Sequence, residues 1–113
     1  MSTQLEFQLA AWAEQLKQRQ ELNDSLSTPR QIDHFFTFND KKTADEAAIT
    51  LSQRNFEVTV SKKGIFKAEL SATHVSDLKD ETVKPLITQM VAIAEQHSGE
   101  YDGFGATVGR RAD

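Results

Sequence analysis

The stretch from Glu100 to Val108, close to the C-terminal end, most constrains how this chain can fold. Alternate residues differ in character, which predicts a strand with two distinct faces. The face predicted to meet a core holds Phe104, Ala106 and Val108, and strict alternation places Asp102 in the same set. The opposite face holds Tyr101, Gly103, Gly105 and Thr107. Interior glycines weaken a strand and mark a bulge or a close backbone approach. We therefore expect another segment or a partner to pack on Gly103 and Gly105, which we call the glycine strip.

Composition limits the remaining possibilities. At 113 residues the chain is expected to form one domain that buries a core without metal or disulfides. It has no cysteine, which excludes disulfides, thiolate nucleophiles and zinc-thiolate sites. A net charge of −4 argues against nonspecific binding of nucleic acid. The N-terminus has no signal-peptide pattern, and no stretch approaches the ~20 apolar residues of a membrane span, so we expect a cytoplasmic protein.

The first segment is predicted to be a long amphipathic helix over residues 4–22, followed by a turn-rich linker. We expect a division into helix and linker (1–30), a compact domain (31–108) and a flexible tail (109–113). Two interpretations of the apolar helix stripe stay open. The favoured one packs the stripe on the chain's own sheet, covering Phe35, Tyr101 and the glycine strip; the other makes it a dimer or partner surface. The stripe consists of Leu5, Leu9, Trp12, Ala13 and Leu16.

The middle of the chain predicts a strand, a helix and a hairpin. Residues 32–38 carry aromatic residues on both faces, which indicates a central strand that is covered at least partly on each side. A helix over 43–54 is expected to begin with a capping box at Thr43 to Glu46. Strands at 56–60 and 65–73 flank a turn at 61–64 and form an antiparallel hairpin. The hairpin residues expected to face inward are Phe66, Ala68, Leu70 and Ala72.

A last helix is expected to be capped between Asp80 and Thr82 and to end before Gly99, which suits a left-handed position. The element order is then α followed by β-α-β-β-α-β. This order predicts the α+β class and a ferredoxin-like antiparallel sheet with its helices on one face. In the usual strand order, 4-1-3-2, the strand at 100–108 lies at an edge beside the strand at 32–38.

Chemical motifs are few. An RNA-recognition sheet would place stacking aromatic residues where this chain has Ile65 and Lys67, although Lys63 and Gly64 fit the start of that pattern. The three histidines have no metal-ligand spacing, and His34 is predicted to be a satisfied core-edge residue. We find no catalytic constellation and expect neither an enzyme nor a cofactor. An RNA-binding or small-ligand module on the open sheet face remains the alternative function.

Three stretches resemble the regulator of ribonuclease E activity B family: residues 56–58, residues 90–95 and, above all, residues 100–105. That family has a helix followed by the same β-α-β-β-α-β order. Its last strand carries a Tyr-Asp-Gly-aromatic-Gly signature, which matches Tyr101 to Gly105. The similarity covers roughly residues 31–108 and, more weakly, the N-terminal helix.

The resemblance implies a cytoplasmic, non-catalytic protein that binds ribonuclease E, or the degradosome containing it, and restrains RNA cleavage. Members with this activity tend to continue into a long acidic tail, whereas this sequence ends at Gly109 to Asp113. If acidic charge docks on a basic nuclease segment, this difference implies weaker binding or another partner. We expect a protein partner, no direct nucleic acid or membrane contact, and a monomer or weak homodimer. The predicted partner-binding residues are Trp12, Phe35, Tyr101, Asp102, Gly103 and Gly105.

Overall fold

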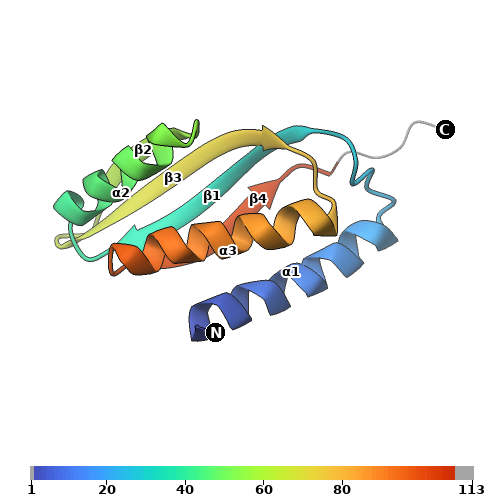
Figure 1. Cartoon of the computed structure of the whole chain (residues 1–113), viewed down its shortest axis with the longest axis horizontal. Helices are drawn as coiled ribbons and strands as arrows, with labels where there is room; N and C mark the ends of the chain where they lie inside the picture. Colours follow the sequence, from blue (N-terminus) through green and yellow to red (C-terminus); the bar gives the residue numbers. More distant parts are fainter. Residues whose placement is uncertain (1, 109–113) are drawn as a thin grey trace.

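Within residues 2–108, four antiparallel strands form one sheet, and three helices accompany it (Figure 1). The computed structural model describes residues 2–108, so the expected flexible tail at 109–113 lies outside the described residues. None of the helices in this part of the chain is long and apolar enough to cross a membrane. The elements are α1 (Thr3–Glu21), β1 (Arg30–Phe38), α2 (Lys41–Gln53), β2 (Glu57–Lys63), β3 (Lys67–Ser76), α3 (Asp80–Gln96) and β4 (Glu100–Ala106).

The sheet has the order β2-β3-β1-β4, which reads β4-β1-β3-β2 from the other edge. Strand β1 lies in the interior of the sheet and pairs with both β3 and β4. Strands β2 and β3 form the expected hairpin. The structure therefore confirms the α+β class and the antiparallel sheet, and it places β4 at an edge beside β1.

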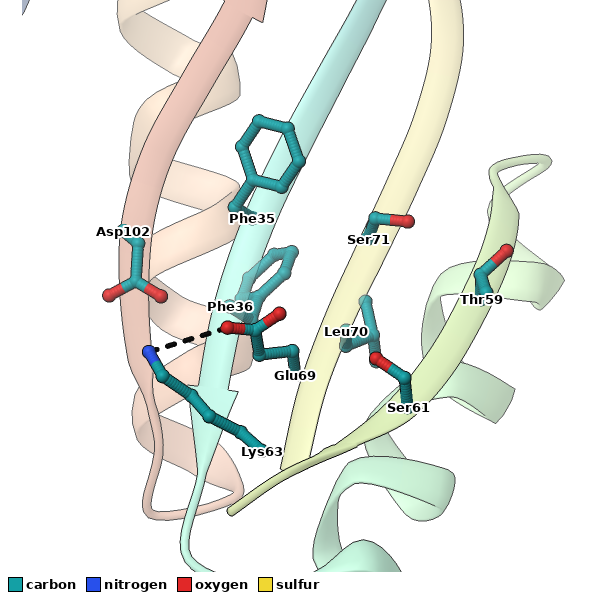
Figure 2. A pocket seen from close by; sticks show the side chains of 9 residues that line it. All are labelled: Phe35, Phe36, Thr59, Ser61, Lys63, Glu69, Leu70, Ser71 and Asp102. Atoms are coloured by element: carbon teal, nitrogen blue, oxygen red, sulfur yellow. Dashed lines mark ion pairs between the residues drawn. The ribbon is translucent and has the colours of Figure 1, made fainter. Parts of the chain in front are cut away.

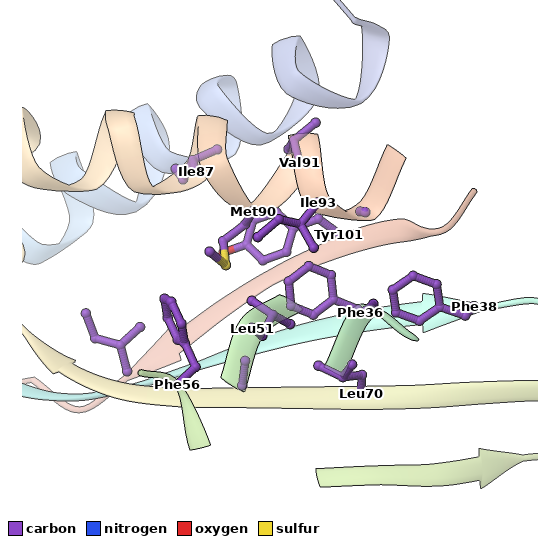
Figure 3. Packing of buried hydrophobic residues seen from close by; sticks show 14 of the residues in the cluster. Phe36, Phe38, Leu51, Phe56, Leu70, Ile87, Met90, Val91, Ile93 and Tyr101 are labelled. Carbon is purple, nitrogen blue, oxygen red and sulfur yellow. The ribbon is translucent and has the colours of Figure 1, made fainter. Parts of the chain in front are cut away.

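One face of the sheet builds the core, because alternate residues of β1 and β3 are buried. Both α2 and α3 contribute to the same buried cluster, so both cover this face (Figure 3). Burying one large apolar side chain contributes about 1.5–3 kcal/mol, so this cluster is the main source of stability. The sheet supplies Ile32, Phe36, Phe38, Ala68, Leu70, Ala72 and Tyr101. The helices α2 and α3 supply Ala44, Ala47, Leu51, Val83, Ile87, Met90, Val91, Ile93 and Ala94.

A β-bulge in β4 overturns the predicted assignment of its faces. Tyr101 pairs with Phe36 and Gly103 pairs with Phe35, so Asp102 is the extra residue. Gly103 has a φ of 105°, a conformation that glycine adopts readily and other residues avoid. The strict alternation expected from the sequence therefore fails at this point.

The consequence of the bulge is an exchange of faces. Tyr101, predicted to lie on the face of the glycine strip, is 2% exposed and belongs to the core. Asp102, which strict alternation would place on the same face as Phe104, is exposed. Phe104 packs against the core as predicted. Val108, also predicted to face the core, lies beyond β4 and is 42% exposed.

The start of α2 is another correction. Asp40, not Thr43, is the N-cap residue, and its Oδ1 accepts hydrogen bonds from the backbone N–H and the hydroxyl of Thr43, each at 2.7 Å. The Thr43 N–H also lowers the pKa of Asp40. The predicted capping box is wrong, because a short carboxylate two residues after β1 already satisfies an orphan N–H group of the first turn.

Two turns also differ from prediction. Strand β2 continues to Lys63, so the turn falls on residues 64–66 and Phe66 is 79% exposed rather than inward. After α3, Ser98 takes the left-handed position predicted for Gly99, with a φ of 57°. Gly99 is needed for space, since an added Cβ would lie 2.3 Å from the ring of Phe38.

Helix α1 lies beside α3 and along β4 (Figure 1). Trp12 is 1% exposed, so the favoured interpretation, that the stripe packs on its own chain, holds for this residue. The helix does not cover Phe35, which lies on the other face of the sheet and is 46% exposed. On this side of β1 the expected cover is only partial, since Asp33 and Thr37 are half-buried and Phe35 is exposed. Of the other stripe residues, Leu5, Leu9 and Leu16 are partly buried and Ala13 is exposed.

Candidate partner-binding surface

The outer edge of β4 is occupied by polar side chains of α1. Gln4 Oε1 accepts a hydrogen bond from the Tyr101 N–H at 2.5 Å, and Gln8 Nε2 donates to the Tyr101 carbonyl at 2.9 Å. Further along, Arg19 Nη2 donates to the Ala106 carbonyl at 2.9 Å. Unpaired backbone groups on an edge strand attract other strands, so α1 blocks this edge for a partner.

Trp12 fixes α1 to α3 and to β4. Its indole Nε1 donates to Asp80 Oδ1 at 2.8 Å, and this hydrogen bond lowers the pKa of Asp80. Its ring centroid lies 5.8 Å from that of Phe104. The indole therefore has both its polar and its apolar requirements met inside the chain.

The face of the sheet opposite the core is left open, and Phe35 lies in it. This residue of β1 pairs with Ser71 on β3 and Gly103 on β4. Beside it is a hollow of about 550 Å³ (Figure 2). We call this surface the open face. The residues that line the hollow are Phe35, Phe36, Thr59, Ser61, Lys63, Glu69, Leu70, Ser71 and Asp102.

Two carboxylates accompany Phe35 on the open face. Asp102 Oδ2 accepts a hydrogen bond from Thr37 Oγ1 at 2.6 Å, and Asp33 Oδ1 accepts one from Thr73 Oγ1 at 2.9 Å. Neither carboxylate forms an ion pair within residues 2–108. Threonine hydroxyls thus hold two negative charges in place near an exposed aromatic ring, an arrangement that suits a cationic side chain.

One ion pair crosses the open face. Lys63 Nζ lies 3.3 Å from Glu69 Oε1, and Figure 2 shows the two side chains approaching each other near Asp102. Both side chains are about half exposed, so the pair contributes little to stability and can open to admit a partner.

The buried His34 and the partly buried His74 have a structural role. His34 Nδ1 lies 2.8 Å from the Tyr101 hydroxyl, and its Nε2 lies 3.0 Å from Nε2 of His74. Burial, together with the nearby His74, lowers the pKa of His34 to about 3, while Asp33 acts in the opposite direction. Burial also lowers the pKa of His74 and raises that of Tyr101. His34 is therefore a neutral, satisfied core residue, as the sequence predicted.

The structure divides the predicted partner-binding residues into two groups. Phe35, Asp102 and Gly105 belong to the open face, where an added Cβ at Gly105 would lie 3.9 Å from the Phe35 ring. Gly103 turns toward α1, with Gln8 Oε1 3.4 Å from the position of its Cβ. Trp12 and Tyr101 are buried, so neither offers its side chain to a partner while α1 stays in place.

Several open-face residues were missed in the sequence. Asp33, Glu69 and Ser71 belong to strands whose alternation was identified, so their outward direction could be predicted. Their grouping could not, because it depends on how β1, β3 and β2 pair.

Within residues 2–108, no group of three or more His, Cys, Asp or Glu side chains is placed to hold a metal ion. No serine or threonine hydroxyl in this part of the chain hydrogen-bonds to a histidine. The fold and surface thus define a small α+β protein with an open, acidic and partly aromatic sheet face. The family model described as regulator of ribonuclease activity B matches residues 10–106, and the chain belongs to this family. A comparison with curated proteins gave no match. The family is one of regulators of ribonuclease activity, which implies a protein partner.

Proposed function

We propose that this chain is a non-catalytic, protein-binding regulator that docks on ribonuclease E, or on its degradosome, and restrains RNA cleavage in the cytoplasm. Membership of the family supports the regulatory role. The strand order β4-β1-β3-β2 supports a ferredoxin-like arrangement, in which one sheet face is free for a partner.

The observation that carries the proposal is Phe35, 46% exposed on the open face beside the carboxylates of Asp33 and Asp102. Large exposed aromatic residues are the usual anchors of protein interfaces. The partner segment is expected to be basic, since a carboxylate pair attracts Lys or Arg and repels the phosphates of RNA.

A binding and cleavage assay with ribonuclease E tests the proposal. Phe35→Ala is expected to weaken binding by about 2 kcal/mol, roughly 30-fold, and to relieve inhibition in parallel. Asp102→Asn is expected to weaken binding less and to reduce its salt dependence. Ile49→Ala is the matched control, because Ile49 is a similarly exposed apolar residue on α2.

Two outcomes would contradict the proposal. One is a Phe35→Ala protein that binds and inhibits as well as the unmodified chain. The other is tight, salt-sensitive binding of single-stranded RNA that Phe35→Ala abolishes, which would favour the RNA-binding alternative.

A further inference from the structure

The two edges of the sheet differ in what covers them. At the β4 edge, Gln4, Gln8 and Arg19 hydrogen-bond to outward backbone groups. At the β2 edge, no side chain of residues 2–108 hydrogen-bonds to the backbone of residues 57–63, and α2 packs on the core face. The edge of β2 is therefore a template for another strand.

Strand β2 is regular along its whole length. Each of its seven residues pairs in register with β3, with no bulge to twist the edge away. It contains neither glycine nor proline. Common devices that prevent edge pairing are thus absent from β2, apart from its charged residues.

Two of the three charged residues of β2, Glu57 and Lys63, are placed so that the strand complements itself, while Lys62 lies opposite Val58. In an antiparallel pairing about Val60, Glu57 of one strand lies opposite Lys63 of the other, and this happens twice. Thr59 then lies opposite Ser61. A shift of two residues in either direction places Glu57 opposite Ser61 or Lys63 opposite Thr59, and both charge pairs are lost. Cross-strand opposite charges stabilise and like charges destabilise, so one register is selected.

We propose that β2 pairs with β2 of a second copy of this chain, about a two-fold axis at Val60, to form a homodimer with a continuous sheet. Such an interface is isologous, because each copy contributes the same surface. Pairing with Glu57 of the second copy would cost Lys63 little stabilisation, because its ion pair with Glu69 within the chain is half exposed. Opposed residues of paired strands share a face, so the two open faces lie on the same side of the dimer. A partner with two binding segments would then gain avidity.

Sedimentation equilibrium of the unmodified chain, Glu57→Lys, Lys63→Glu and a 1:1 mixture of these two variants tests the dimer. The unmodified chain is expected to show a concentration-dependent dimer. Each variant alone places like charges opposite each other, and its dimer dissociation constant should rise about tenfold or more. The mixture should regain a dimer, because the reversed charge at 57 in one variant faces the reversed charge at 63 in the other.

The matched controls are Glu46→Lys and Lys42→Glu on α2, which change the net charge equally. They should dimerise like the unmodified chain and show no preference for each other. Circular dichroism of all variants verifies the fold. A chain that stays monomeric at every concentration overturns the dimer, as does a mixture that associates no better than its components. Neither outcome bears on the binding of ribonuclease E, which is measured separately.

Discussion

The Nδ1 atom of His34 lies 2.8 Å from the hydroxyl oxygen of Tyr101, inside the core between β1 and β4. The other ring nitrogen of His34 meets His74 at 3.0 Å, so both nitrogens of a buried imidazole have partners. Tyr101, which belongs to the stretch that resembles the family signature, thus completes a hydrogen-bonded network with His34 and His74. The network explains why a tyrosine, and not only an aromatic ring, stands at position 101.

Tyr101→Phe should lower the free energy of unfolding by about 1–3 kcal/mol, because it leaves Nδ1 of a buried histidine without a partner. Urea unfolding followed by circular dichroism measures the loss. Under conditions where the variant is folded, its binding to ribonuclease E should stay unchanged, since Tyr101 is 2% exposed. Weakened binding with unchanged stability would show that the position acts at the interface.

The same network should make stability depend on pH. The pKa of His34 is about 3 in the folded chain and 6.5 ordinarily, so the unfolded chain binds more protons between these values. Stability is therefore lost as the pH falls below 6.5, by about 2 kcal/mol at pH 5, and His74 adds to the loss in the same direction.

Urea unfolding at pH 7 and pH 5 measures this effect before most carboxylates titrate. The matched variant is His34→Gln, which keeps a hydrogen-bonding group but does not titrate. Its stability should change much less over this range. An unmodified chain that is equally stable at both pH values would show that His34 becomes protonated without cost in the folded state.

Much of the fold could be predicted because hydrophobic periodicity reports burial directly. The buried residues Val83, Ile87, Met90 and Val91 recur at helical spacing in the sequence, and Ala68, Leu70 and Ala72 are buried in alternation as predicted. These patterns depend only on neighbours along the chain, and they gave the element order. In the same way, the stretch from Tyr101 to Gly105 predicted the family, and the family model confirms that prediction.

What failed depends on contacts between distant residues. The bulge at Asp102 appears only when β4 is paired with β1, and it moves Tyr101 and Asp102 off the faces that strict alternation gives them. The cover of the β4 edge by Gln4 and Gln8 could not be predicted either, because the polar face of a helix is usually exposed to solvent. The sequence pattern also gave the wrong N-cap residue at the start of α2, where Asp40 and Thr43 are both residue types that can cap a helix.

A buried ion-pair cluster joins α1 to β1. Asp24, with a fully buried side chain, lies 2.7 Å from Arg19 Nη1 and 2.6 Å from Arg30 Nη1. Asp24→Asn should cost about 3–5 kcal/mol, because it leaves two largely buried guanidinium groups without a compensating charge. The control is Asp45→Asn, which removes an exposed pair with Lys41 and should cost at most about 0.5 kcal/mol. Equal costs in urea unfolding would contradict this account.

The two glycines of the strip should differ sharply in their tolerance of a methyl group. Gly103 has a φ of 105° in the bulge, so Gly103→Ala should cost about 1–3 kcal/mol through backbone strain. Its added Cβ would also press on Gln8, 3.4 Å away. Gly105→Ala should stay within about 0.5 kcal/mol, because its Cβ would meet Phe35 at an ordinary 3.9 Å. Thermal and urea unfolding of the two variants measure the difference, and a Gly105→Ala cost equal to that of Gly103→Ala would mean that the strip, not the bulge, requires glycine.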